Sequence, residues 1–272
     1  MKKAINAWSV DPSTGFEEMF AHIKAAGFEG IELNVDRAGA HSLTMDTGEA
    51  ELAAIKALSE KYGLPVVSVA TSLWGAMPMT EPGSRALLEQ QLKCAHALGA
   101  RGILTVPGGM SDAVSLARAY ETCAANLRSW LPLIGEYALF VGLENVWNMF
   151  FTSPFDMRGL IDALGSPLVG AYCDVGNPVA FSRPEDWIDV LGHRIGLVHI
   201  KDFRRNGGPN SGGAFCALGK GSVDWKRVVP ALWRAGFDGY LTAEVFKEEN
   251  QNYTEFYRAT SKAMDHIIHI GG

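Results

Sequence analysis

The stretch Ala26-Gly27-Phe28-Glu29-Gly30-Ile31-Glu32-Leu33 ends a predicted helix at a glycine and begins a short apolar strand directly after it. Close copies of this phrase run over 98–105 and 235–242, and looser copies begin at Tyr62, Leu164 and Leu191. One turn unit that recurs this often indicates a chain built from repeated strand–helix units. The fold should therefore alternate strands and helices along its length.

Eight short apolar runs fit the strands of these units, at 3–9, 30–35, 65–71, 102–106, 139–145, 168–173, 195–201 and 239–245. The segments between the first five runs contain amphipathic stretches that predict helices, at 14–26, 49–62, 82–99 and 112–136. Apolar strands that alternate with helices form a parallel sheet covered on its outer face, and eight such units close into a (β/α)8 barrel, or TIM barrel. We expect residues 1–272 to form this single domain. An open doubly wound sheet is the alternative, but no Gly-x-Gly-x-x-Gly follows the first predicted strand.

The composition is that of a compact, acidic protein. Hydrophobic residues make up 47% of the chain and charged residues 20%, so a full core can be buried. The formal net charge of -6 gives no attraction to nucleic acid or to an anionic membrane, and no apolar run reaches the roughly 18 residues of a membrane span. The opening residues lack the apolar stretch of a signal peptide, and the four cysteines form no Cys-x-x-Cys pair. We therefore expect a cytoplasmic protein with a small-molecule partner, and a homo-oligomer is compatible with this composition.

Four polar residues stand at or near the ends of successive predicted strands: Glu144, Asp174, His199 and Glu244. In a TIM barrel the active site lies at the carboxyl ends of the strands, and neighbouring strands are about 4.8 Å apart. The four side chains can therefore converge on one ion at about 2 Å. Without a cation, three carboxylates in that space would repel one another and take up protons. The oxygen-rich set suits one divalent metal ion, with Mn²⁺ favoured and Mg²⁺, Co²⁺ or Zn²⁺ as alternatives.

The motifs around these residues resemble a known family. They are Leu143-Glu144-Asn145, Cys173-Asp174-Val175-Gly176-Asn177, Val198-His199-Ile200-Lys201-Asp202, Leu218-Gly219-Lys220-Gly221-Ser222-Val223-Asp224-Trp225 and Ala243-Glu244-Val245. Their order is similar to that in the xylose isomerase-like barrels of the sugar-phosphate isomerase/epimerase superfamily. The resemblance covers most of the chain, with specific motifs only from Glu144 onward. It implies that the quartet binds one divalent metal and that Glu144 and Glu244 also act as acid and base.

The resemblance implies 3-epimerisation of a ketose or ketose phosphate, in which one glutamate takes a proton, a metal-bound enediolate forms, and the other glutamate returns a proton on the opposite face. Return to the adjacent carbon would give aldose–ketose isomerisation instead. Free-ketose 3-epimerases place a histidine three residues after the metal-binding aspartate, where this chain has Asn177. In this respect it is similar to the L-ribulose- or L-xylulose-5-phosphate 3-epimerase branch.

Asn177 and several further residues are candidates for contacting substrate. Arg205 stands six residues after His199, where the resemblance implies a substrate-binding arginine, and Lys201 stands at the strand end itself. Glu32, Trp8 and Trp74 are candidate pocket-wall residues, although both tryptophans also fit as packing residues over the barrel mouth. Asn145 is a candidate for orienting its neighbour in the metal site. The glycine-rich segment 203–221 is predicted to be an irregular functional loop that could hold a phosphate.

Other functions remain open on the same residues. They are a free-ketose 3-epimerase, an aldose–ketose or hydroxypyruvate-type isomerase, an inosose-type dehydratase, and a sugar-binding barrel without catalysis. An apurinic-site endonuclease shares the barrel, but it needs three zinc ions and a histidine where Asn177 stands. Binding alone needs no pair of acid–base glutamates, so we expect an enzyme of the isomerase class.

Overall fold

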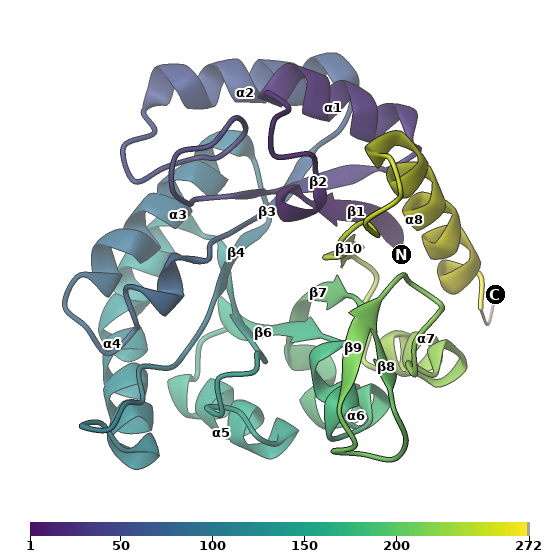
Figure 1. Ribbon diagram of the computed structural model, residues 1–272. Helices are drawn as coiled ribbons and strands as arrows, with labels where there is room; N and C mark the ends of the chain where they lie inside the picture. Colours follow the sequence, from purple (N-terminus) through teal and green to yellow (C-terminus); the bar gives the residue numbers. More distant parts are fainter. Residues whose placement is uncertain (271–272) are drawn as a thin grey trace.

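The computed structural model describes residues 1–270, and its central feature is a closed barrel of eight parallel strands (Figure 1). The strands follow the order β1-β10-β7-β6-β5-β4-β3-β2 around the barrel. They are β1 Lys2–Asn6, β2 Gly30–Asn34, β3 Val66–Ala70, β4 Gly102–Thr105, β5 Phe140–Glu144, β6 Val169–Asp174, β7 Ile195–Ile200 and β10 Tyr240–Ala243. Each lies within or overlaps one of the eight predicted runs, so the predicted (β/α)8 fold is confirmed.

Eight helices cover the outside of the barrel, as Figure 1 shows. They are α1 Phe16–Ala25, α2 Glu49–Tyr62, α3 Ser84–Leu98, α4 Leu116–Tyr137, α5 Pro154–Leu164, α6 Pro184–Leu191, α7 Trp225–Arg234 and α8 Tyr253–Ile268. Short 3-10 helices are η1 Ala7–Ser9, η2 Leu73–Gly75, η3 Asn177–Ala180 and η4 Gly192–Arg194.

The repeated glycine phrase ends helices in the way that the sequence predicts. Gly63 and Gly99 follow α2 and α3 with φ of 56° and 73°, a left-handed conformation that glycine adopts without steric cost. The N–H of Gly99 bonds to the carbonyl of His96, and Ala100 then leads the chain inward to β4. The phrase therefore marks points where the chain turns from the outer layer into the barrel, whereas α4 ends without it, at Ala138 with a φ of 52°.

The glycine-rich segment 203–221 is not the irregular loop that we expect from the sequence. Strands β8 Asp202–Arg205 and β9 Gly213–Cys216 pair in an antiparallel hairpin between β7 and α7, with Phe203 opposite Phe215. The Asp202 carboxylate accepts hydrogen bonds from the backbone N–H groups of Gly219, Gly221 and Val223, so it pulls the returning chain back to the barrel. A buried carboxylate therefore organises a segment that its glycine content predicts to be irregular.

Two further observations bear on the predicted class of protein. Within residues 1–270 no helix combines the length and the apolar character that a membrane crossing requires. The cysteines Cys94, Cys123, Cys173 and Cys216 are all free thiols, and the first three are buried.

Candidate metal centre and active site

The structure brings the four predicted metal ligands together at the carboxyl ends of their strands. Glu144 and Asp174 are the last residues of β5 and β6, His199 is the penultimate residue of β7, and Glu244 directly follows β10. One ligand atom from each lies within 4.8 Å of all the others. The Nδ1 atom of His199 is 3.0 Å from Glu144 Oε1 and 3.2 Å from Glu244 Oε2. The cluster is therefore small enough for its members to share one ion.

Asp174 is fixed in a way that suits a metal ligand. Its Oδ1 atom accepts the N–H groups of Gly176 and Asn177 at 2.8 and 2.6 Å, while its buried Oδ2 atom has no hydrogen-bond partner. Burial raises the pKa of this carboxyl. Asn145 clamps the Asp174 backbone, accepting from its N–H at 2.8 Å and donating to its carbonyl at 2.9 Å. A buried carboxylate oxygen that accepts no hydrogen bond, in a rigid cluster of further carboxylates, fits a divalent cation.

Lys201 contributes a positive charge to the cluster. Its ammonium lies 2.7 Å from Glu244 Oε2 and 3.2 Å from Asp174 Oδ2, and its side chain is only 13% exposed. Burial opposes that charge, but the two carboxylates hold the pKa of Lys201 above its usual value. The candidate substrate-binding lysine is thus paired with ligands of the metal site, although it also lines the cavity above them.

The two glutamates of the cluster differ in their affinity for a proton. Burial raises the pKa of Glu144 to about 7, although the His199 imidazole works against this shift. Burial also acts to raise the pKa of Glu244, but the Lys201 ammonium and the His199 imidazole together outweigh it, and the pKa is lowered to about 2. Two carboxyl groups of one site with different proton affinities are typical of acid–base enzymes.

Glu32 lies behind the metal site, on the far side of the His199 ring. Its Oε2 atom is 2.6 Å from His199 Nε2, and its carboxylate also accepts from Asn6, Ser68 and Tyr172 at 2.5, 2.6 and 2.7 Å. It is fully buried and is not one of the described residues that line the cavity. A carboxylate behind a ligating histidine fixes the tautomer and the ring orientation, here with Nδ1 toward the cluster. Its placement suits positioning of His199 better than the pocket-wall role expected from the sequence.

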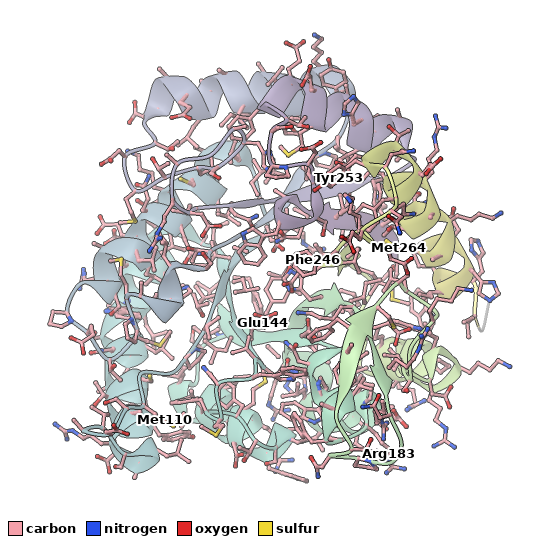
Figure 2. The ribbon with its side chains drawn as sticks, viewed as in Figure 1. Met110, Glu144, Arg183, Phe246, Tyr253 and Met264 are labelled. Atoms are coloured by element: carbon pink, nitrogen blue, oxygen red, sulfur yellow. The ribbon has the colours of Figure 1, made fainter. Side chains whose placement is uncertain are left out.

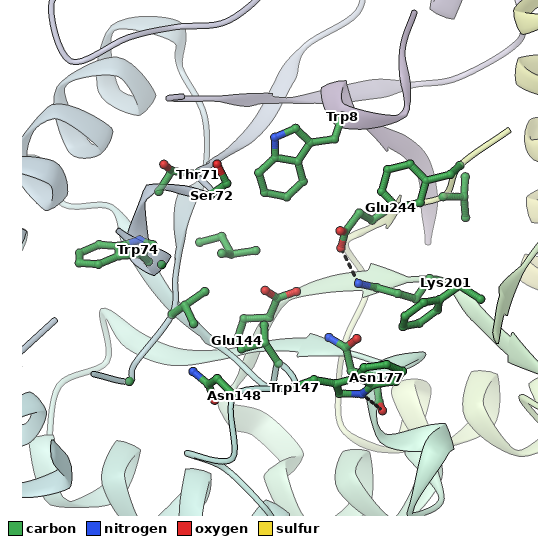
Figure 3. A pocket seen from close by; sticks show the side chains of 18 of the residues that line it. Trp8, Thr71, Ser72, Trp74, Glu144, Trp147, Asn148, Asn177, Lys201 and Glu244 are labelled. Atoms are coloured by element: carbon green, nitrogen blue, oxygen red, sulfur yellow. Dashed lines mark hydrogen bonds and ion pairs between the residues drawn. The ribbon is translucent and has the colours of Figure 1, made fainter. Parts of the chain in front are cut away.

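A cavity of about 870 Å³ opens above the cluster, and Figure 3 shows the Glu144 and Glu244 carboxylates turned toward it. The candidates Trp8, Trp74 and Asn177 all line it. Trp74 is 3% exposed and donates to Gln91, so it also packs, while Trp8 lies in η1 beyond the end of β1 and donates to Asp36 at 2.6 Å.

Arg205 is placed differently from the other candidates. It ends β8 and does not belong to the lining of this cavity in the described part of the chain. Lining residues that were not predicted as substrate contacts include Trp147, Phe215 and Phe246. The only sequence signal for the first was its place beside Glu144. Phe215 lies in the glycine-rich segment 203–221 and Phe246 follows Glu244 by two residues, but no motif distinguishes either side chain.

A closed (β/α)8 barrel with a carboxylate–histidine cluster at the carboxyl ends of its strands defines a TIM-barrel protein of the enzyme type. The chain belongs to the family described as xylose isomerase-like TIM barrel, whose model matches residues 20–266.

Curated relatives and a solved structure agree with this assignment. A 3-oxo-isoapionate decarboxylase from Pectobacterium atrosepticum is 31% identical over 153 residues, which is 53% of each chain, so this chain aligns with about half of that relative's length. A 2-epi-5-epi-valiolone 7-phosphate 2-epimerase from an Actinoplanes species is 25% identical over 84% of this chain and 80% of its own. A structure described as L-ribulose 3-epimerase superposes with a TM-score of 0.78 at 17% identity, over 98% of this chain and 94% of the other.

Proposed function

We propose that the protein is a divalent-metal-dependent sugar epimerase or isomerase that moves a proton on a carbon beside a carbonyl group. The observation that carries this proposal is the pair Glu144 and Glu244. Both carboxylates lie within 3.2 Å of His199 Nδ1, come from different parts of the barrel rim and face the same cavity. Simple ligand binding needs no such pair, whereas proton removal and return at one carbon need two groups that reach it from different directions.

Glu144, Asp174, His199 and Glu244 would hold the ion, for which we propose Mn²⁺. Bound there, it supplies a Lewis acid that polarises the carbonyl oxygen and acidifies the neighbouring C–H group. Glu244, kept ionised by Lys201 at 2.7 Å, takes the proton from that carbon. Glu144 then returns a proton to the same carbon on the opposite face, which gives epimerisation. Return to the adjacent carbon, with transfer of the hydroxyl proton to the former carbonyl oxygen, gives isomerisation. Asp174 and His199 hold the ion without moving the proton.

The relatives bear on the class of substrate. Epimerases among the relatives support a carbonyl sugar, and 3-epimerisation of a ketose or ketose phosphate is the reaction we propose. We also propose a cytoplasmic location. Decarboxylation of a 3-oxo acid is a second candidate, because a 3-oxo-isoapionate decarboxylase is 31% identical over about half of this chain. Loss of carbon dioxide from such an acid produces the same kind of enolate that proton removal produces from a ketose.

The test is hydrogen exchange from solvent. Protein saturated with Mn²⁺ is incubated in D₂O with a panel of pentuloses, hexuloses and their phosphates, and deuterium at the carbon beside the carbonyl is followed by NMR. We expect exchange with at least one sugar, and its loss in Glu144→Gln and in Glu244→Gln. Glu136→Gln, which changes an exposed glutamate on α4, is the matched control. Absence of exchange across the whole panel would refute the proposal, and release of carbon dioxide from 3-oxo acids would replace it with the decarboxylase.

A further inference from the structure

The cavity is large for the reaction that its floor supports. Its volume is about 870 Å³, toward the upper end of the range of roughly 300–1,000 Å³ that accommodates a drug-sized ligand. A single pentulose or hexulose is much smaller than such a ligand. With its carbonyl end at the Glu144–Glu244 cluster, a monosaccharide would leave the outer part of the cavity to solvent. The space therefore has room for a second group attached to the reacting sugar.

An aromatic wall, defined as Trp147, Phe215 and Phe246, lines this cavity. Its Phe215 ring lies 5.4 Å from the Lys201 ammonium, so the wall begins beside the Glu144–Glu244 cluster. Trp147 stacks on Phe215 with ring centroids 5.0 Å apart and planes 28° apart. The Trp147 indole N–H donates to the carbonyl of Asn177 at 2.7 Å, and the buried Phe203 packs edge-on against both rings. These contacts hold the Trp147–Phe215 pair in a fixed orientation, so it forms a pre-organised platform.

The side chains of the aromatic wall are more exposed to solvent than is usual for large apolar residues. Trp147, Phe215 and Phe246 are 52%, 41% and 65% exposed, whereas most large apolar side chains of the described chain are buried. Figure 2 shows Phe246 and Glu144 close to the centre of the barrel mouth. Exposed aromatic side chains that gather at a cavity mark a binding surface, and a flat ring suits the C–H face of a sugar ring.

The cavity has no free cation for a phosphate group among its described lining residues. Lys201 and Lys247 are the basic ones, against the acidic Glu144, Glu244 and Glu248. The Lys201 ammonium is already paired with Asp174 and Glu244. The Lys247 ammonium donates to the backbone carbonyl of Glu248 at 3.2 Å and lies over the Tyr253 ring at 5.4 Å. Outside the metal cluster the charged lining residues are Lys247 and Glu248, whose charges cancel, so a phosphate dianion in that part of the cavity would meet no net positive charge.

We propose that the substrate is an uncharged sugar of two rings, in which a ring bearing the carbonyl lies at the metal cluster and a second ring stacks on the aromatic wall. The proposal rests on the proposed function for the reacting ring and adds the class of substrate. The cavity volume leaves room for the second group, and the exposed aromatic platform can contact a ring. The lack of a free basic side chain in the described lining disfavours a phosphate as that group. The relative from Actinoplanes is named for a 7-phosphate, so the class of substrate separates this chain from that relative.

The experiment compares three matched substrates in the D₂O exchange assay with Mn²⁺-loaded protein. They are a keto-disaccharide, the keto-monosaccharide that corresponds to its reacting ring, and the phosphate of that monosaccharide. We expect kcat/KM to be at least about tenfold higher for the disaccharide, because one well-placed aromatic contact changes affinity by about this factor. A higher kcat/KM for the phosphate or the free monosaccharide would overturn the inference while leaving the proposed function intact. Absence of exchange with these three sugars and with every other carbonyl sugar of the panel would remove the proposed function itself.

Variants locate the second ring. Trp147→Ala should raise KM for the disaccharide about tenfold and leave KM for the monosaccharide within about twofold. Phe246→Ala should act in the same direction, and the variant should fold because the Phe246 side chain is 65% exposed. Trp233→Ala, at a tryptophan that is 44% exposed on α7 and outside the cavity lining, is the matched control. Equal effects of Phe246→Ala and Trp147→Ala on both substrates would contradict a separate place for a second ring.

Discussion

Glu32→Gln should weaken metal binding although Glu32 is not a ligand. The two side chains have the same shape, but the introduced glutamine would present an NH₂ group where Glu32 has a carboxylate oxygen. If the amide oxygen keeps the donors Ser68 and Tyr172, the NH₂ group faces His199 Nε2, which lies 2.6 Å from Glu32 Oε2 in the unchanged protein. The imidazole must then accept on Nε2 and carry its proton on Nδ1, the atom that faces Glu144 and Glu244.

The expected magnitude follows from the role of such outer carboxylates. Loss of one typically costs about 10–100-fold in metal affinity, or about 1.4–2.8 kcal/mol. The same change leaves the buried amide of Asn6 opposite another donor, since it donates to Glu32 Oε2 in the unchanged protein, and this costs roughly 1–3 kcal/mol of folding free energy. The loss of metal affinity and the loss of folding free energy can be measured separately.

The assay is calorimetric titration of Mn²⁺ into protein stripped with a chelator, with urea denaturation for the stability. Ser68→Ala is the comparison, because it removes one donor to Glu32 and leaves the contact with His199 in place. We expect it to change the Kd for Mn²⁺ less than about threefold. A folded Glu32→Gln protein whose Kd stays within about twofold of the unchanged chain would refute the reasoning.

Three further predictions concern stability. Asn145→Ala leaves the Asp174 N–H and carbonyl unpaired in a buried site, so the free energy of unfolding in urea should fall by about 2 kcal/mol or more; an unchanged value would contradict the clamp. Mn²⁺ at 100 times its Kd should stabilise the protein by about 2.7 kcal/mol and raise Tm by roughly 5–10 °C in a thermal melt, and the increment should vanish in Asp174→Asn; its persistence would place the ion elsewhere. Gly99→Ala, at a φ of 73°, should lower the free energy of unfolding in urea by about 1–2 kcal/mol, because alanine is strained in this left-handed conformation. Gly15→Ala, at a φ of -74°, should lower it by about 0.5 kcal/mol or less. Equal losses would contradict the conformational argument.

The barrel and the meeting of its carboxylate–histidine cluster were predictable because they depend on local patterns. A helix that ends at a glycine and an apolar run that follows it, as at Gly99 and 102–105, specify one strand–helix unit without reference to distant residues. Parallel strands of a barrel also place their carboxyl ends on one side. Polar residues at those ends, such as Asp174, therefore have to meet their counterparts on neighbouring strands.

The residues whose contacts depend on barrel closure were not predictable in the same way. Glu32 on β2 meets His199 on β7, but these strands are not neighbours, so only the closed barrel brings the two side chains together. Arg205 was placed by its spacing from His199, yet the hairpin that carries it is organised by Asp202, whose partners lie 17 or more residues further along the chain. Spacing along the chain could not reveal either arrangement.

The most direct test of the central claim is a crystal structure of the protein grown with Mn²⁺, with anomalous diffraction data collected to locate the ion. We predict one strong anomalous peak in contact with Glu144, Asp174, His199 and Glu244 at about 2.0–2.3 Å from each, and no comparable peak elsewhere. A protein that binds no Mn²⁺ at this cluster, or that binds it with ligands other than these four, would contradict the claim.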